Sequence, residues 1–246
     1  MINYAHRGAS AYAPENTMTA FGMGVQMGAN GIETDVQRTR DGVLVLHHDT
    51  TLKRTAGIDR CVSEMTWREI SALDVGRWKA DFYSGERIVR LEDFLYYFGG
   101  KPLRFAIEIK QPGIEKETLA SVRRYLTPER YTITSFRLES LLTLAGEGVR
   151  LGYLTAEFSP ELLERLRDAG IAEYCPDART FTGERARAVR DCGLGLRAWG
   201  VRDAALMNAM ADMGVDGMTV NFPDMLAERM RRDEHAAAED GGMYAR

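Results

Sequence analysis

Residues 31–48 read GIETDVQRTRDGVLVLHH, and this stretch predicts a strand, a tight turn and a returning strand. The two strands are expected over residues 31–38 and 43–48, with Arg-Asp-Gly as the turn between them. Side chains two positions apart on a strand point to the same face. Glu33 and Asp35 are therefore expected to project together from the first of these strands.

Outside this hairpin, strand-type runs alternate with helical patterns along the chain. The eight main strands are expected over residues 2–6, 31–38, 104–110, 131–136, 150–154, 173–176, 196–201 and 217–222. Helices are expected over residues 17–26, 91–98, 117–126, 138–145 and 204–213, and between Ser159-Pro160 and Gly170. A chain of 246 residues with this alternation predicts one α/β domain, a (β/α)8 TIM barrel, a fold that typically takes about 250 residues.

Residues 50–90 do not follow the alternation. Thr66 and Glu69 form the sequence of a capping box before a short apolar helix. A segment of this length in a compact domain is usually functional or separately folded. We expect a small inserted subdomain after the second strand, over the barrel mouth, within a single domain that spans residues 1–246. The tail from Arg229 is expected to be a helix end that frays.

The composition is ordinary for a globular protein, with 45% hydrophobic and 28% charged residues. The net charge of −4 argues against a general nucleic-acid-binding protein, which would present a basic face. No apolar run approaches the ~20 residues of a membrane span, and the N-terminus does not resemble a signal peptide. The 3 cysteines are scattered, as free thiols in a reducing compartment would be. We therefore expect a cytoplasmic protein.

Carboxylates gather at the ends of two predicted strands. Glu33 and Asp35 share one strand face, and Glu108 and Lys110 share another. At the C-terminal end of a barrel strand, this face looks into the mouth where active sites are found. Three carboxylates without a cysteine partner favour a hard divalent cation, such as Mg²⁺ or Ca²⁺.

Two histidines and an arginine lie beside these carboxylates in the sequence. His6 ends the first strand, and Arg7 could bind phosphate oxygens through its planar fork. His48 is followed by Asp49, which could orient the imidazole. Two histidines near neutral pKa can share acid and base work on a phosphoester. His47 is expected to be structural or exposed, because it points to the opposite strand face from its neighbour.

A series of short motifs runs through the chain in one order: residues 5–8 (AHRG), 14–17 (PENT), 33–36 (ETDV), 39–42 (TRDG), 48–55 (HDTTLKRT), 73–76 (LDVG), 108–110 (EIK), 135–136 (SF), 199–201 (WGV) and 214–217 (GVDG). In this order and spacing, the motifs resemble the glycerophosphodiester phosphodiesterase family. The resemblance extends from residue 3 to about residue 226, which is nearly the whole chain.

The resemblance implies a metal-dependent barrel that cleaves a small-molecule glycerophosphodiester to glycerol 3-phosphate and an alcohol. The family's small inserted subdomain matches residues 50–90. Carried over position by position, the family's site corresponds to His6 and His48 as the acid–base pair, Glu33, Asp35 and Glu108 as metal ligands, and Arg7 and Lys110 as phosphate-side cations.

Two strand ends depart from the family pattern. The seventh strand ends in Trp-Gly-Val-Arg at residues 199–202, where the family commonly has Trp-Thr-Val-Asn. The eighth has Thr-Val-Asn at residues 219–221, where the family commonly has Thr-Asp or Thr-Asn. Both departures concern substrate-side contacts. Arg202 is expected to form a surface salt bridge, although it could reach an acidic group of a ligand. Phe136 and Trp199 either line the glycerol or alcohol side of the pocket or pack within the barrel.

Two other functions remain open at this point. The first is a phospholipase-D-like hydrolysis of lysophospholipids, which would need an apolar trough, and the inserted segment shows no obvious apolar lid. The second is a catalytically silent phosphate-binding barrel, although every acid–base and ligand position is occupied. The attacking group is either the substrate's own glycerol hydroxyl or water. The sequence leaves open the metal, the alcohol head group and the oligomeric state.

Overall fold

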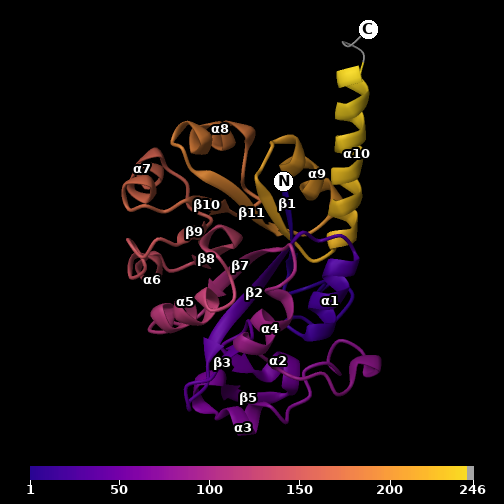
Figure 1. Ribbon diagram of the computed structural model, residues 1–246, viewed down its shortest axis with the longest axis vertical. Coiled ribbons are helices and arrows are strands. Elements are labelled where there is room, and N and C mark those ends of the chain that lie inside the picture. The colour runs from indigo at the N-terminus through magenta and orange to yellow at the C-terminus, as the bar shows by residue number, and fades with distance from the viewer. Residues whose placement is uncertain (243–246) are drawn as a thin grey trace.

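A computed structural model describes the backbone of residues 1–242 and the side chains of residues 1–237 (Figure 1). Parallel strands close into a barrel in the order β1-β12-β11-β10-β9-β8-β7-β2, and β1 pairs with β2 to complete the ring. This confirms the expected TIM barrel. The strands are β1 (Ile2–His6), β2 (Gly31–Arg38), β7 (Arg104–Ile109), β8 (Tyr131–Ser135), β9 (Arg150–Thr155), β10 (Glu173–Pro176), β11 (Gly195–Val201) and β12 (Gly217–Val220).

Helices follow the strands and surround the barrel (Figure 1). They are α1 (Met18–Gln26), α4 (Leu91–Phe98), α5 (Glu115–Arg123), α6 (Leu138–Leu142), α7 (Pro160–Asp168), α8 (Gly183–Asp191), α9 (Ala204–Asp212) and α10 (Pro223–Gly242). Thr182 caps α8, and side-chain caps also begin α1, α7 and α9, because Thr17, Ser159 and Asp203 each accept a hydrogen bond from a backbone N–H of the first turn. The starts of α1, α7 and α9 agree with the sequence prediction.

Two helices differ from the expectation. The sequence did not single out α8, because Ala186 and Val189 are its only buried residues and leave a weak helical pattern. The tail expected to fray from Arg229 instead continues as α10 to Gly242. Arg229 pairs with Asp212 at 2.8 Å and with Asp233 at 2.9 Å, which ties the helix to its neighbour α9. Residues 243–246 lie outside the described residues.

The main hydrophobic core lies between the barrel and its helices. Helix α4 buries one stripe of its surface completely, and aromatic rings from three elements meet there. The rings of Phe21 and Phe94 are 4.7 Å apart, and those of Phe94 and Phe105 are 5.8 Å apart at right angles. Such tilted arrangements are the favourable ones for aromatic pairs. This contact fixes α1 and α4 against the strands that carry the acidic residues.

The segment after β2 has a hydrophobic core of its own. Strand β3 (Leu44–Leu46) returns antiparallel to β2, as expected, and pairs with β6 (Val89–Arg90). The elements between them are β4 (Thr51–Leu52), α2 (Lys53–Ala56), β5 (Ile58–Cys61), η1 (Val62–Glu64), α3 (Trp67–Ile70) and η2 (Asp81–Tyr83). Seven buried residues form their separate core: Val45, Leu52, Val62, Met65, Ile70, Val75 and Ile88.

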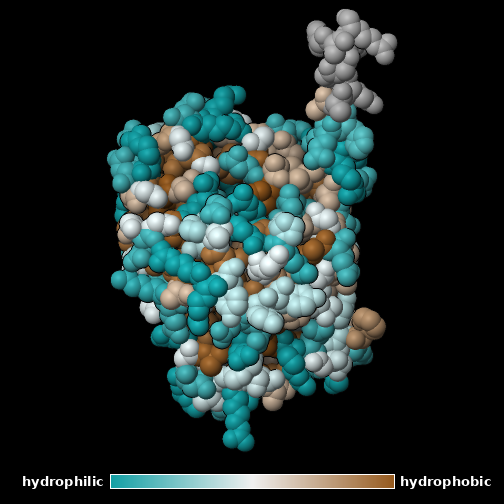
Figure 2. Space-filling view, in the orientation of Figure 1, coloured by the Kyte–Doolittle hydropathy of each residue, from teal (hydrophilic) through white to brown (hydrophobic). Residues whose placement is uncertain are grey.

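This inserted segment lies beside the loop between β1 and α1. The ammonium of Lys79 donates to the carbonyl of Ser10, and the hydroxyl of Tyr83 donates to the carbonyl of Tyr12, both at 2.8 Å. The face of the molecule in Figure 2 is mostly hydrophilic, with apolar residues in small groups. None of the described helices combines the length and the hydrophobicity that crossing a membrane requires.

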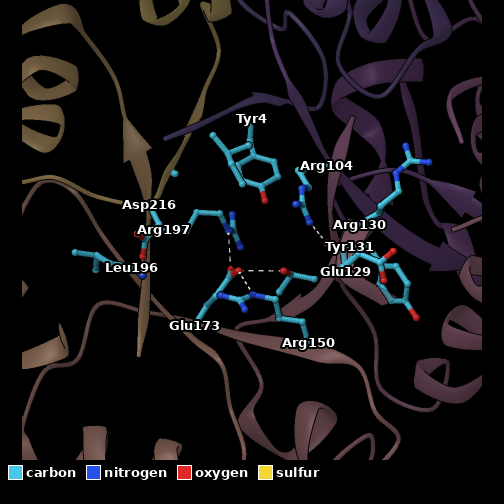
Figure 3. Close-up of a pocket in the computed structure, with 13 residues that line it drawn as sticks. Tyr4, Arg104, Glu129, Arg130, Tyr131, Arg150, Glu173, Leu196, Arg197 and Asp216 are labelled. Atoms are coloured by element: carbon cyan, nitrogen blue, oxygen red, sulfur yellow. Dashed lines mark hydrogen bonds and ion pairs between the residues drawn. The ribbon is translucent and has the colours of Figure 1, made fainter. Parts of the chain in front are cut away.

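The N-terminal end of the barrel contains a buried ion cluster (Figure 3). Arg197 is 2% exposed, donates to Thr219 Oγ1 at 2.8 Å and lies 3.4 Å from Glu173. Glu173 also accepts from Arg150 at 2.9 Å and from Thr132 at 3.1 Å. One carboxylate is therefore shared between the fully buried guanidinium of Arg197 and the partly exposed one of Arg150. The cluster borders a cavity of about 320 Å³.

We predict that Glu173→Gln destabilises the fold strongly, because Arg197 would keep a buried charge without a counter-ion. Breaking a buried ion pair by removing one partner typically costs about 3–5 kcal/mol. Urea unfolding of this variant should show that loss, whereas Glu184→Gln on the exposed face of α8 should change stability by less than about 0.5 kcal/mol. Equal stabilities of the two variants would show that the cluster does not stabilise the fold.

Candidate active site

The register of three neighbouring strands brings the predicted acidic residues together. His6 on β1 is paired in register with Glu33 on β2, and Asp35 on β2 is paired with Glu108 on β7. These positions lie at the C-terminal ends of the strands, where TIM barrels carry their active sites. The pairing of parallel strands thus turns an i, i+2 spacing into a compact cluster of side chains.

Glu33, Asp35 and Glu108 form this cluster. Carboxylate oxygens of the three residues lie within 4.8 Å of one another, and the residues are 4%, 0% and 7% exposed. Burial and the neighbouring carboxylates raise the pKa of Glu33 well above its usual value and that of Glu108 to about 7. Burial alone would also raise the pKa of Asp35, but Arg7 and Lys110 hold it well below its usual range.

The cluster fits a hard divalent cation. Three buried carboxylates that repel one another would be relieved by a positive ion, and oxygen ligands suit Mg²⁺ and Ca²⁺. Asp35 Oδ1 is buried and accepts no hydrogen bond from the described residues. An unsatisfied buried oxygen of this kind is costly unless it has a ligand. The donor set and the orphaned oxygen therefore agree with the metal site that the sequence resemblance implies.

Two cations contact the carboxylates directly. Lys110 Nζ lies 2.7 Å from Glu108 and 3.6 Å from Asp35. Arg7 Nε lies 3.1 Å from Asp35, and its backbone N–H donates to Glu33 at 3.2 Å. Arg7 has a φ of 57°, a left-handed conformation that is uncommon outside glycine and frequent at functional sites.

Gly8 allows this unusual backbone turn to pack against helix α1. Its φ is 86°, and a Cβ at this position would lie 2.4 Å from the carbonyl carbon of Ala20. A side chain would therefore displace either the helix or the loop that carries Arg7. Glycine, which has no Cβ, is the residue that permits such a turn.

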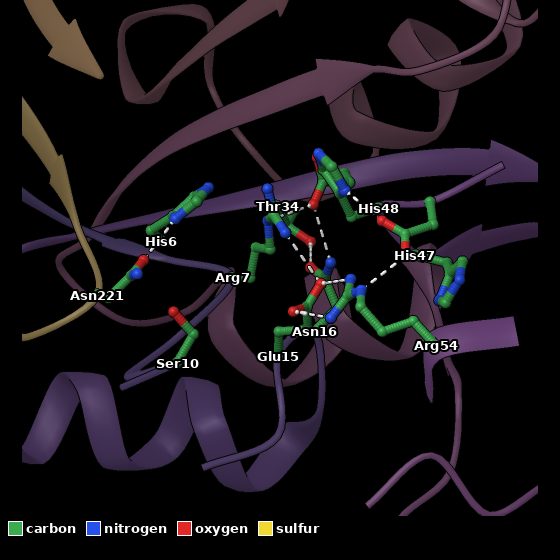
Figure 4. Close-up of polar contacts among 12 residues, drawn as sticks. His6, Arg7, Ser10, Glu15, Asn16, Thr34, His47, His48, Arg54 and Asn221 are labelled. Carbon is green, nitrogen blue, oxygen red and sulfur yellow. Dashed lines mark hydrogen bonds and ion pairs between the residues drawn. The ribbon is translucent and has the colours of Figure 1, made fainter. Parts of the chain in front are cut away.

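His6 is oriented by a residue from the far end of the chain (Figure 4). Its Nδ1 lies 2.6 Å from Asn221 Oδ1, and its Nε2 lies 3.9 Å from Glu33. With Nδ1–H donating to the amide oxygen, the Nε2 atom is free to accept a proton. Burial and the charge of Arg7 lower the pKa of His6 to about 4, so the ring is neutral near pH 7. Asn221 also lines the cavity, but the sequence gave it no role toward His6.

His48 has a different partner, a carboxylate. Its Nδ1 lies 2.7 Å from Asp49 Oδ1, as the adjacent positions suggested. Asp49 is paired with Arg54 at 2.7 Å, and Arg54 is paired with Glu15 at 2.7 Å. Glu15 in turn accepts from Arg7 at 2.9 Å, so a chain of ion pairs connects His48 to the cations around the cluster (Figure 4).

The sequence analysis assigned no role to three polar residues that contact the predicted site residues. Glu15, Asn16 and Arg54 belong to quoted motifs of the family resemblance but received no role. Asn16 donates to Asp35 at 2.9 Å and accepts from Thr34 at 2.7 Å. The motifs signalled that these residues matter, but a contact between positions 15 and 54 can be found only from the fold.

His47 lies away from the cavity. It is 4% exposed, and its Nε2 is 3.2 Å from the carbonyl of Thr51. The expected strand over residues 43–48 is shorter than predicted, because β3 ends at Leu46 and both histidines follow it. Even so, the two imidazoles point in different directions, and His48 alone of the two lines the cavity.

A cavity of about 270 Å³ joins these residues at the barrel mouth. One side holds His6, Arg7, Glu33, His48 and Glu108, and the opposite side holds Phe136, Leu154, Trp199, Val201 and Arg202. The rings of Phe136 and Trp199 are 5.0 Å apart and nearly perpendicular. Both aromatics therefore border the cavity, and Lys110 lies just behind it, 5.9 Å from the Phe136 ring.

Two expectations about the rim differ from the structure. No residue of the described segment 50–90 lines the cavity, so the insertion flanks the mouth and does not cover it. It contacts the site through Arg54, which pairs with Glu15 and Asp49 at 2.7 Å and stacks on Trp78 of the same segment at 5.1 Å. Arg202 was expected in a surface salt bridge, but no carboxylate of the described side chains lies within 4.0 Å of it.

We predict that His48→Ala lowers kcat by about 10²–10⁴-fold, the usual contribution of a general acid–base group. His47→Ala should lose less than about tenfold, because only the position of the neighbouring backbone would change. Steady-state kinetics of both variants test this, with circular dichroism to show that each is folded. The opposite ranking would mean that the imidazole at position 47 is the reactive one.

Comparisons with known proteins agree with this geometry. The model of the glycerophosphoryl diester phosphodiesterase family matches residues 6–225. A glycerophosphodiester phosphodiesterase of Caldanaerobacter subterraneus is 34% identical over 93% of this chain and 97% of its own. A solved phosphodiesterase of Oleispira antarctica, in complex with the product sn-glycerol-3-phosphate, has a TM-score of 0.84 and 25% identity over 93% of this chain and 96% of its own. A solved glycerophosphodiester phosphodiesterase of Agrobacterium tumefaciens has a TM-score of 0.80 and 31% identity over 92% and 98% of the two chains.

Proposed function

The chain belongs to the glycerophosphoryl diester phosphodiesterase family and is a phosphodiester hydrolase, and we propose that it hydrolyses glycerophosphodiesters to glycerol 3-phosphate and an alcohol with the help of a divalent metal. The observation that carries this proposal is a cavity lined by two separately oriented histidines, Arg7 and two carboxylates of the buried cluster, with the third carboxylate, Asp35, and Lys110 beside them. Such a set can bind a phosphodiester and move protons on both of its ester oxygens.

Glu33, Asp35 and Glu108 would hold the metal, Mg²⁺ or Ca²⁺. When bound, a divalent cation supplies Lewis-acid polarisation of the phosphate. Arg7 and Lys110 neutralise part of the carboxylate charge and lie where they can donate to phosphate oxygens. The held conformation of Arg7, between Glu15 and Asp35, limits the reorganisation needed to bind the substrate.

The two histidines would divide the proton transfers according to their partners. His6 donates through Nδ1 to the neutral Asn221, which leaves Nε2 as an acceptor for the proton of the attacking hydroxyl. His48 donates to the carboxylate of Asp49, which orients the ring, and His48 would protonate the leaving alkoxide. The attacking hydroxyl is either the glycerol hydroxyl of the substrate or water, and both use the same proton acceptor.

The size of the cavity favours small substrates. About 270 Å³ accommodates a glycerophosphodiester but leaves little room for a long acyl chain. This supports a small diester over the lysophospholipid of the alternative function. The complete set of proton carriers argues against a silent phosphate-binding barrel.

We also propose one catalytic domain in which residues 50–90 support the site from the side. Arg54 of this segment pairs with Glu15 and Asp49, so the segment can hold His48 in place without contributing to the chemistry. A cytoplasmic location is part of the proposal. All three cysteines are free, which is consistent with a reducing compartment.

We expect hydrolysis of glycerophosphoglycerol to stop on chelation and to return when Mg²⁺ or Ca²⁺ is added. Glu108→Gln should raise the metal concentration needed for half-maximal activity by at least about tenfold, because one charged ligand is lost. Metal titrations of the activity measure this, with Glu164→Gln on the exposed face of α7 as the matched control. Full turnover in a chelated, metal-free sample would contradict the metal requirement.

A further inference from the structure

We propose that Arg202 makes the cavity select glycerophosphodiesters whose alcohol carries a negative charge. The inference rests on the proposed function and adds a substrate class to it. It starts from an exposed guanidinium that borders the cavity and whose neighbouring carboxylates have other partners.

Arg202 lies across the cavity from the metal-binding carboxylates. It follows β11 directly, and Glu108 is the penultimate residue of β7. In the ring order β1-β12-β11-β10-β9-β8-β7-β2, these two strands are diametrically opposed. A diester with its phosphate at the carboxylate side therefore extends one of its two substituents toward Arg202. Because the glycerol substituent is uncharged in every such diester, only the alcohol can bring a charge to this side.

The acidic residues near Arg202 already have other partners. Asp177 contributes to its surroundings, but both carboxylate oxygens of Asp177 accept from Arg179, at 2.8 and 2.9 Å. Asp203 caps α9 by accepting from the backbone N–H of Leu206 at 2.9 Å. Within the described side chains, no hydrogen bond or ion pair engages the guanidinium of Arg202. Its charge and its planar fork of donors are therefore available to a ligand.

The aromatic residues next to Arg202 could suggest the opposite preference, a cationic head group such as choline. Trp199 and Phe136 form a perpendicular pair of the kind that can enclose a quaternary ammonium. However, Lys110 already lies 5.9 Å from the Phe136 ring, and Arg202 borders the same cavity. A third cation would be repelled by both. A carboxylate or phosphate on the alcohol would instead be attracted and could bind the guanidinium bidentately.

The test uses three diesters that differ in the charge of the alcohol. They are glycerophosphoglycerol, its analogue with a terminal phosphate on the alcohol, and glycerophosphocholine. We compare kcat/KM of the unaltered protein, Arg202→Ala, Arg202→Glu and the control Arg187→Glu, which makes the same charge reversal on the exposed face of α8. Measurements at low and high salt show whether the preference is electrostatic, since salt weakens exposed charge interactions.

The unaltered protein should prefer the phosphate-bearing diester over glycerophosphocholine, and Arg202→Ala should reduce this ratio by about fivefold, the size expected for one partly exposed charge interaction. Arg202→Glu should reduce it further, whereas Arg187→Glu should leave it unchanged. If Arg202→Glu lowers kcat/KM equally for all three diesters, or if the ratio does not respond to salt, the proposal is wrong.

Equilibrium dialysis separates this inference from the proposed function. The three diesters are dialysed against the His48→Ala variant in Mg²⁺, with and without Arg202→Ala, so that binding is measured without turnover. If the phosphate-bearing diester binds more tightly than the other two, and this difference depends on Arg202, the inference is supported. If the unaltered protein then hydrolyses none of the three diesters, only the proposed function is overturned. Hydrolysis without any charge preference in binding would overturn only the inference.

Discussion

Mutual repulsion among Glu33, Asp35 and Glu108 is the constraint around which the site is arranged. Their oxygens lie within 4.8 Å of one another in a buried place, where like charges interact strongly. Arg7 and Lys110 offset part of this charge, and together they keep Asp35 ionised. Two cations against three carboxylates leave an unbalanced negative charge and the unsatisfied Asp35 Oδ1. A divalent cation bound among these carboxylates would relieve this imbalance.

The strand pairing of the barrel holds these three carboxylates close together despite their repulsion. Parallel strands fix which residues are neighbours, so Asp35 and Glu108 meet because β2 and β7 pair in one register. A slip of one residue would turn the side chains to the other face. Outside the barrel, the rings of Phe21 and Phe94 pack together and Phe94 also contacts Phe105 of β7, while inside the barrel the buried Glu173–Arg197 pair joins β10 to β11 at the opposite end. Stability and chemistry thus depend on the same strand pairing, at opposite ends of the strands.

The sequence could predict features that depend on neighbouring residues. The i, i+2 spacing of Glu33 and Asp35 and the start of α7 at Ser159-Pro160 are local, and the structure agrees with both. It could not predict Asn221 beside His6, because 215 positions separate them and only barrel closure joins them. The pairing of Arg54 with Glu15 has the same origin. The expected salt bridge of Arg202 was wrong because Asp177 pairs with Arg179, a preference set by the loop after β10.

The two halves of the cavity differ in how strongly their side chains are fixed by strand register. The half formed by β1, β2 and β7 holds buried charges whose spacing is fixed by strand register, so a small displacement there would alter every interaction at once. The half formed by β8 to β11 presents Phe136, Trp199 and Arg202, of which Phe136 and Arg202 are exposed and project from strand ends and loops. Substitutions in the second half change what the cavity attracts without disturbing the carboxylate cluster. Under the proposals above, the residues that would carry the phosphodiester chemistry and the residue that would set the charge of the preferred alcohol lie on different sides of the cavity, and no described ion pair links Arg202 to the carboxylate cluster.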